Sequence, residues 1–347
     1  MKGKLILEDG SVFFGELLNN IKASGEVVFN TGVVGYQELL TDPSYCRQIV
    51  TMTYPLIGNV GVAEEFMQSR KAFVNGLVIG ELCDEGSNYH MENSLESFLL
   101  KQGIPCLYNV DTRAITRKTR SAGSMKGVIV AEDSTKAEAD ELFNIPLRHD
   151  MVEEVTTPEA YVIENDGPNV VVLDLGIKKK LITPLSDLGC KLTVVPATAS
   201  YDEIMGYKPA GVVISNGPGS AEDIAPIVEM VKKLADAKMP MFGFDLGHLV
   251  LAAAFGAKSC KMKFGHHGAN QPVKILETGK VNITAQGHNF ALDAKSFDGL
   301  PLKITHASLN DDTVEGMEHK ELPIFSVQYH PEADLYKRFV AMLKKGE

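Results

Sequence analysis

The sequence lacks several features that would place it in common protein classes. It has no apolar run long enough to cross a membrane, and its apolar start, MKGKLILEDGSVFFG, is interrupted by Glu8 and Asp9. It has no G-x-x-x-x-G-K-[ST] loop for binding nucleotide phosphates. Positive charge is not in excess either, because the formal net charge is −11. These absences predict a protein with no membrane span, no secretion signal, no ATP loop of this kind and no nucleic-acid surface.

Cysteine is scarce and unpatterned. The five cysteines are odd in number, scattered and free of C-x-x-C spacing, which favours a reducing cytoplasm over a disulfide framework or a zinc site. The adjacent His266 and His267 have no carboxylate at ligand spacing, so we expect them to form hydrogen bonds and we predict no metal site.

The length and the change of pattern along the chain predict two domains. A chain of 347 residues, 44% hydrophobic and 23% charged, is long enough for two separate cores. The pattern changes near residue 169, where apolar strands begin to alternate with helices. We predict an N-terminal domain over 1–150, a connector over 151–168 and a C-terminal domain over 169–347.

The N-terminal part is rich in β-structure. Leu5–Leu7 and Val12–Phe14 flank an Asp-Gly turn and predict a hairpin, and Val27–Phe29 predicts a third strand. Asn30–Val62 is dense in Gly, Pro, Tyr and Thr, and long ordered segments of this kind usually bind a ligand or partner or line a site. The basic piece Arg117–Arg120 is interpreted as the solvated face of a helix.

The C-terminal part predicts a mainly parallel sheet. Val170–Gly176, Leu192–Val195, Gly211–Ser215 and Met239–Phe244 are unbroken apolar runs separated by helical segments. Strands of this kind are buried on both faces, with the functional site at their carboxyl ends. The region Val273–Phe325 is β-rich with short alternating runs.

The prediction of a functional site in this domain rests on one turn. The strand that ends at Phe244 leads into Gly243–Phe244–Asp245–Leu246–Gly247 and then into an apolar helix, which is the layout of a nucleophile elbow. At such an elbow a Ser or Cys attacks a carbonyl, but this chain has Asp245. Aspartate tolerates the positive φ of the turn, yet it is poorly suited to acyl chemistry.

The other parts of an acyl-transfer site are present in the sequence. His330 is the candidate base and Glu332 the group that orients it. The backbone N–H groups of Gly217 and Leu246 are the candidate oxyanion hole. If the elbow forms, the carboxylates of Asp245 and Glu332 should raise the pKa of His330.

Motifs along nearly the whole chain carry a family resemblance. They are GYQELLTDPSY, IVTMTYPLIGNVGV and DTR in the N-terminal part, and SNGPG, FGxxLGH, KMKFGHHGANQPV, ITAQ and QYHPEA in the C-terminal part. With these motifs the chain resembles the small, glutamine amidotransferase subunits of carbamoyl-phosphate synthases. The resemblance implies an α/β fold, with a C-terminal class I amidotransferase domain (flavodoxin-like, a mainly parallel sheet flanked by helices) and a β-rich α/β N-terminal domain.

The resemblance also implies partners and small molecules. The N-terminal domain would contact a large synthetase subunit, which would bind ATP, Mg²⁺ and bicarbonate, so this chain itself would need no cofactor. The C-terminal domain would take glutamine and deliver ammonia to make carbamoyl phosphate for arginine and pyrimidine biosynthesis.

Site residues can be carried over from the family by position. The family has a cysteine where this chain has Asp245, and His330 and Glu332 complete the triad. The glutamine pocket would be formed by the matching positions Ser44, Gly217, Gly219, Leu246 and Phe290.

Several pocket positions depart from the family pattern. Leu249 stands where the family has Gln, Gly287 where it has Asn, Asn289 where it has Gly, and Ser220 where Asp is usual. We therefore predict a small subunit with lost or severely impaired glutaminase activity that supports an ammonia-dependent large subunit. Two alternatives stay open: a glutamine-dependent subunit with an engineered nucleophile mutation, and a regulatory module that binds a small amide without chemistry.

Overall fold

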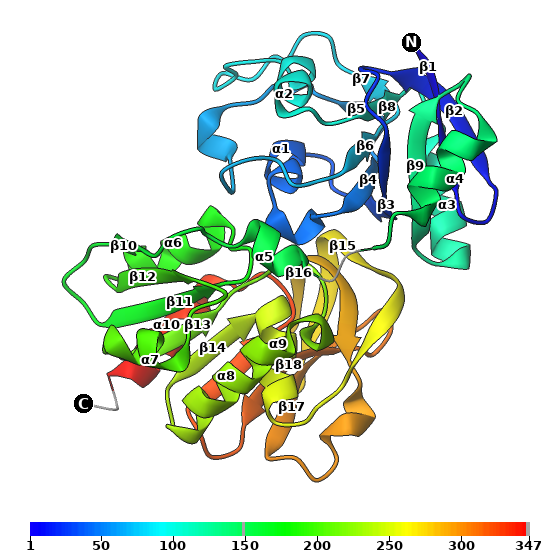
Figure 1. The fold of residues 1–347 in the computed structure, drawn as a ribbon. Coiled ribbons are helices and arrows are strands. Elements are labelled where there is room, and N and C mark those ends of the chain that lie inside the picture. Colours follow the sequence, from blue (N-terminus) through cyan, green and yellow to red (C-terminus); the bar gives the residue numbers. More distant parts are fainter. Residues whose placement is uncertain (148–149, 345–347) are drawn as a thin grey trace. The chain divides into compact units, whose positions relative to one another are not determined.

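The computed structural model describes residues 1–147 and 150–344 (Figure 1). The chain divides into two compact units. The first comprises Met1–Arg148 with Lys263–Gly268, and the second comprises His149–Met262 with Ala269–Glu347. The first boundary lies close to the predicted one. The predicted connector 151–168, however, carries the helix α5 (Met151–Val155) and the strand β10 (Tyr161–Ile163) of the second unit, and β10 forms the edge of that unit's sheet.

The first unit is built on a closed barrel with the strand order β1-β2-β8-β6-β4-β3-β9. Its strands are β1 (Lys2–Leu7), β2 (Val12–Leu17), β3 (Ala23–Asn30), β4 (Gln48–Met52), β6 (Gly76–Val78), β8 (Cys106–Tyr108) and β9 (Met125–Ala131). The predicted hairpin is confirmed, because β1 and β2 pair antiparallel and Gly10 has a φ of 87° in the turn. β3, β4, β6 and β8 run parallel to one another.

The long segment 30–62 is ordered by short elements around one apolar cluster. It contains α1 (Tyr36–Leu40), a 3₁₀ turn (Pro43–Tyr45), β4 and β5 (Leu56–Ile57), and β5 pairs with β7 (Glu81–Leu82). The hydroxyl of Tyr36 donates to the Gly61 carbonyl at 2.6 Å and ties the two ends of the segment together. The unit also contains the 3₁₀ turn Glu64–Phe66 and the α-helices α2 (Leu95–Gln102), α3 (Thr112–Ala122) and α4 (Lys136–Asn144).

The second unit holds a ten-stranded sheet with the order β10-β12-β11-β13-β14-β19-β18-β16-β15-β17. The predicted parallel sheet is confirmed for β12 (Lys191–Pro196), β11 (Asn169–Asp174), β13 (Gly211–Ile214), β14 (Met241–Phe244) and β19 (Ile324–Val327). The β-rich remainder is antiparallel where β19, β18 (Val314–His319) and β17 (Leu302–Ser308) pair. β16 spans Val281–Leu292, and β15 spans Ser259–Ile275 and includes the residues that belong to the first unit.

Helices cover both faces of the parallel strands, as their unbroken apolar sequences predict. Val171 and Leu173 of β11 pack into the core formed with α7 (Tyr201–Gly206), α8 (Ala225–Asp236) and α9 (Leu246–Ala254). Val170 and Val172 pack into the opposite core, with α6 (Lys179–Asp187) and α10 (Ala333–Leu343). Figure 1 shows α8 and α9 side by side along the sheet. No helix among residues 1–147 and 150–344 is long and apolar enough to cross a membrane.

Two buried histidines of the second unit make its stability depend on pH. Burial lowers the pKa of His248 to about 3 and that of His306 to about 4. Nδ1 of His248 lies 2.8 Å from Oγ of Ser326, and His248 is fully buried although it belongs to the FGxxLGH motif. Its place in the structure is therefore a core position.

We expect the second unit to lose stability as the pH falls from about 6.5 to about 4. Both imidazoles are neutral in the folded state, whereas in the unfolded chain they bind protons below a pKa of about 6.5. Each histidine therefore lowers the free energy of unfolding by about 1.4 kcal/mol for every pH unit of acidification within this window. Urea unfolding at pH 7 and pH 5 measures the loss. His306→Gln should show a smaller loss than the unsubstituted chain, and an equal loss in both would contradict the prediction.

Candidate functional site

Three chain segments meet at the carboxyl edge of the parallel strands. β14 lies between β13 and β19 and runs parallel to both, with Ile214 opposite Gly243 and Phe244 opposite Val327. The residues that follow these strands therefore lie at one edge: the loop 216–219, the turn at Asp245, and the segment 328–332. This is the edge where the sequence predicts the site.

The turn at Asp245 has the geometry of a nucleophile elbow. Asp245 has φ 54° and ψ −116° and immediately precedes α9. Such a backbone is strained for a residue with a side chain, and strain of this kind clusters at functional sites. Gly247 is required beside it, because a Cβ there would lie 2.1 Å from the Ile214 carbonyl oxygen. The predicted elbow is thus present in the fold.

The carboxylate of Asp245 contacts one of the two predicted oxyanion donors, the N–H group of Gly217. The Gly217 N–H donates to its Oδ2 at 3.3 Å, and the side-chain amide of Gln328 donates to its Oδ1 at 3.4 Å. The side chain is buried, with 4% of its surface exposed. A glycine is needed at 217, since a Cβ there would lie 2.2 Å from the Leu175 carbonyl oxygen. Asp245 therefore occupies the backbone donor that the sequence predicts for an oxyanion hole.

His330 lies at the same edge, but its environment differs from the expected one. Its backbone N–H donates to the Ala285 carbonyl at 3.0 Å, which fixes the residue beside β16. Burial, reinforced by the positive charge of Lys178, holds the pKa of His330 well below its usual value. The expectation that Asp245 and Glu332 raise this pKa is therefore wrong, because desolvation and nearby positive charge both disfavour the imidazolium.

Glu332 is exposed and points to a different partner. Its Oε2 accepts a hydrogen bond from the side-chain amide of Asn282 at 3.2 Å, and the residue immediately precedes α10. Within residues 1–147 and 150–344, no hydrogen bond joins the imidazole of His330 to Glu332 or to Asp245. The three triad positions thus share one edge of the sheet without forming a hydrogen-bonded relay.

Comparison with known proteins identifies the family. The family model described as "Carbamoyl-phosphate synthase small chain, CPSase domain" matches residues 5–129, and "Glutamine amidotransferase class-I" matches residues 171–346. The chain is 44% identical over 361 residues to the carbamoyl phosphate synthase small chain of Bacillus caldolyticus, covering 100% of this chain and 99% of the relative. It belongs to the carbamoyl-phosphate synthase small-chain family.

Two further relatives agree over nearly the full length. The small chain of Caldanaerobacter subterraneus subsp. tengcongensis is 48% identical over 334 residues, covering 96% of this chain and 92% of the relative. The pyrimidine-specific small chain of Bacillus subtilis is 43% identical over 357 residues, covering 100% of this chain and 97% of the relative. The C-terminal domain is therefore a class I amidotransferase domain and the N-terminal domain a small-chain domain.

The pocket positions suggested by the family resemblance fall in four places. Gly219 has φ 89° in the loop after β13, and the next residue, Ser220, hydrogen-bonds Asp223 at 2.9 Å. Leu249, one turn into α9, is packed in the apolar core.

Three further pocket positions, Gly287, Asn289 and Phe290, lie along β16, where Asn289 is buried. Ser44 belongs to the first unit, where its N–H donates to Oδ1 of Asp42 at 3.0 Å.

His266 and His267 also fall in the first unit, and His267 makes the kind of contact that the sequence predicts. Its Nδ1 lies 3.4 Å from the hydroxyl of Tyr45, and the two rings are 5.6 Å apart. All five cysteines are free thiols in the structure.

The sequence reasoning missed a buried polar network behind the site. Gln286 donates to Oε2 of the fully buried Glu315 at 3.0 Å and accepts at its Oε1 from Nε2 of His288 at 2.9 Å. The backbone N–H of Gln328 donates to the Glu315 carbonyl at 2.9 Å. Through Gln328 this network supports Asp245. The parallel pairing of β14 with β19 is the signal that could have found Gln328, because it places the residues after both strands side by side.

Proposed function

We propose that this chain is the small subunit of a carbamoyl-phosphate synthase and that it does not hydrolyse glutamine. In this proposal it persists as the structural and regulatory partner of a large subunit that uses free ammonia. The observation that carries the proposal is the carboxylate of Asp245 at the elbow, bonded to the Gly217 N–H at 3.3 Å.

The chemistry of a carboxylate supports the loss of activity. Attack of Asp245 on the amide of glutamine would form a mixed anhydride and expel ammonia. The tetrahedral adduct would instead expel the carboxylate, which is a far better leaving group than an amide nitrogen, and the substrate would be regenerated. The carboxylate also presents negative charge to the Gly217 N–H, which an oxyanion would otherwise use.

The surrounding pocket supports natural divergence over an engineered nucleophile. Leu249, Gly287 and Asn289 differ from the residues that the family resemblance implies at these positions. A subunit mutated only at its nucleophile would keep the rest of its glutamine pocket. The buried, apolar setting of Leu249 in α9 leaves no hydrogen-bonding group at that position for a substrate.

The need for a large subunit follows from what this chain lacks. Since no G-x-x-x-x-G-K-[ST] loop occurs in the sequence, ATP, Mg²⁺ and bicarbonate are expected to bind the large subunit. The N-terminal unit, including 30–62, is the expected contact. The product would be carbamoyl phosphate for arginine and pyrimidine biosynthesis in the cytoplasm, and the name of the Bacillus subtilis relative supports pyrimidine supply.

The test is to purify the chain with its cognate large subunit and to measure carbamoyl phosphate formation. We expect formation with ammonium chloride, and with glutamine a rate no higher than that of the large subunit alone. His330→Ala is the matched control, because any residual glutaminase of the site should depend on this base. A glutamine-supported rate close to the ammonia-supported rate would overturn the proposal.

A module that binds a small amide without chemistry is the second candidate, and calorimetry separates it from the first. Asp245 and the Gly217 N–H could hold an amide group, because a carboxylate accepts hydrogen bonds from an NH₂ group. Binding of glutamine to the free chain, with no release of ammonia, would favour this candidate. The first proposal expects no heat of binding.

A further inference from the structure

The helix α3 concentrates positive charge in an acidic protein. The chain carries a formal net charge of −11, yet the stretch from Arg113 to Arg120 has four cationic residues and no acidic one. Lys118 pairs with Asp9. Within the described residues, Arg113 and Arg117 form no ion pair or hydrogen bond through their guanidinium groups. The sequence interpretation of Arg117–Arg120 as a solvated helix face does not include Arg113, whose guanidinium group is exposed on the same helix.

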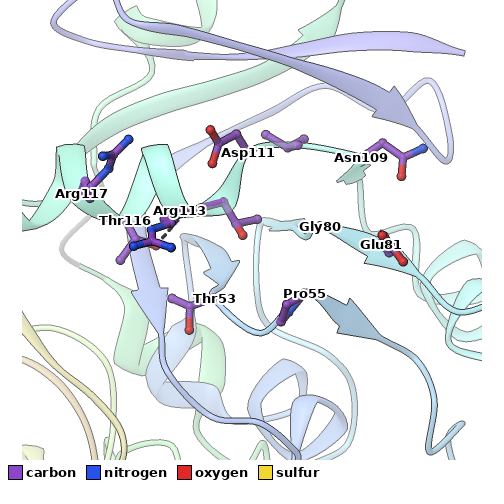
Figure 2. Close-up of a pocket in the computed structure, with 11 residues that line it drawn as sticks. Thr53, Pro55, Gly80, Glu81, Asn109, Asp111, Arg113, Thr116 and Arg117 are labelled. Atoms are coloured by element: carbon purple, nitrogen blue, oxygen red, sulfur yellow. Dashed lines mark hydrogen bonds between the residues drawn. The ribbon is translucent and has the colours of Figure 1, made fainter.

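These two arginines line a cavity of about 620 Å³ in the first unit. They lie four residues apart on α3, so they share one face of the helix. Figure 2 shows both on the helix side of the pocket, with Glu81 and Asn109 at its other end. The pocket thus has two arginines and the capping carboxylate of Asp111 on its helix side, and the carboxylate of Glu81 at the far end.

The barrel builds this pocket from the ends of three parallel strands. Thr53 follows β4, Gly80 follows β6 by two residues, and Asn109 follows β8. Because these strands run parallel, the three residues lie at one carboxyl edge, the place where parallel sheets usually bind ligands. Gly80 is needed for the shape, because a Cβ there would lie 2.6 Å from the Pro55 carbonyl oxygen.

The walls of the pocket are held by hydrogen bonds that leave the arginines free. Oδ1 of Asp111 accepts from the Ala114 N–H at 2.9 Å and caps α3, so this carboxylate serves the helix. The Glu81 N–H donates to the Pro55 carbonyl at 2.7 Å. The side-chain amide of Asn109 donates to Glu16 at 3.2 Å. These contacts hold the residues of the pocket wall and do not involve the guanidinium groups of Arg113 and Arg117.

We propose that this pocket is the docking socket for an acidic segment of the large subunit, which places a carboxylate against Arg113 and Arg117. The inference rests on the proposed function for the existence of that partner. It adds the site and the chemistry of the contact: a carboxylate at the helix end and a cationic or amide group opposite Glu81. A single guanidinium group can bind a carboxylate through two parallel hydrogen bonds, and two such groups add positive charge around it.

The exposure of Arg113 and Arg117 to water favours a protein segment over a small anion as the occupant of the pocket. Both arginines are exposed in this chain, and ion pairs in full contact with water contribute little. A small anion would leave them hydrated. A protein segment that covers the pocket would exclude water and strengthen the same contacts, and arginine is among the residues that dominate such interfaces.

The experiment measures the dissociation constant between this chain and its cognate large subunit. We expect Arg113→Ala and Arg117→Ala each to weaken binding by about 10- to 100-fold. Arg120→Ala is the matched control, because this exposed arginine belongs to the same helix and does not line the pocket. It should change binding by less than about twofold. Circular dichroism and thermal melting verify that the variants fold.

Each other outcome overturns the proposal in a recognisable way. Equal binding by the two pocket variants and the control would overturn the socket while leaving the proposed function intact. Failure of the unsubstituted chain to bind the large subunit would overturn both. Inorganic phosphate or glutamate titrated into the free chain tests the small-anion site. Tight binding of either ion that Arg113→Ala abolishes, with assembly unchanged, would replace the socket by such a site.

Discussion

Asp245→Cys alone is expected to leave glutamine hydrolysis at least about a hundredfold below that of a variant with the pocket also restored. The thiolate would stand at the elbow with φ 54° and would have the Gly217 N–H available for the oxyanion. The variant would then have a nucleophile and an oxyanion donor. It would still lack the side chains that hold glutamine in place for the attack.

The expected deficit comes from binding geometry. Leu249 offers no hydrogen bond to a substrate polar group, and a buried polar group without a partner costs about 1–3 kcal/mol, or about one to two powers of ten in rate. Asn289 adds a side chain on β16, and Gly287 removes one. A displacement of the substrate by about 1 Å can cost about a hundredfold more.

The comparison uses three variants, each measured by ammonia release from glutamine. They are Asp245→Cys, the threefold change that adds Gly287→Asn and Asn289→Gly, and the fourfold change that also adds Leu249→Gln. The threefold variant is needed because Leu249 is 2% exposed in an apolar core, where glutamine could prevent folding. If Asp245→Cys matches a folded threefold or fourfold variant, the pocket is intact and the elbow residue alone limits activity.

Gly247→Ala is expected to destabilise the second unit by more than about 3 kcal/mol or to prevent folding. A Cβ at this position would lie 2.1 Å from the Ile214 carbonyl oxygen and 3.0 Å from that of Ser215. Both contacts are with backbone, so α9 would have to move away from β13. Overpacking of ordinary side chains costs about 1–3 kcal/mol, and a clash with a fixed strand exceeds it.

Gly206→Ala is the matched control for this prediction. Gly206 is the last residue of α7, and a Cβ there would meet no atom within 4 Å. Its replacement should be neutral or stabilising by up to about 1 kcal/mol, because alanine lowers the entropy of the unfolded chain. Urea midpoints of the two variants give the comparison. Equal midpoints would show that the close approach of α9 to β13 contributes no strain.

The local pattern was enough to predict the main elements of the fold. The Asp-Gly turn predicted the hairpin of β1 and β2, and apolar runs such as Val170–Gly176 predicted a parallel sheet buried on both faces. These predictions held because hydrophobic periodicity and turn chemistry act within a few residues. The strand in the segment 151–168 could not be predicted in this way. β10 pairs with β12, about thirty residues further along the chain, and no local pattern indicates that pairing.

By itself, the sequence determined that an aspartate stands at a strand–turn–helix elbow, because Gly243 and Gly247 flank Asp245 in the chain. Only the tertiary structure decided what surrounds that carboxylate and what happens to His330. The pairing of β14 with β19 brings Gln328 to Asp245, and burial lowers the pKa of His330 where charge alone predicted a rise. In the other unit, only the convergence of β4, β6 and β8 turns the basic helix α3 into one wall of a pocket. Burial and long-range strand pairing depend on residues far apart in the sequence, and for that reason the local sequence pattern did not predict them.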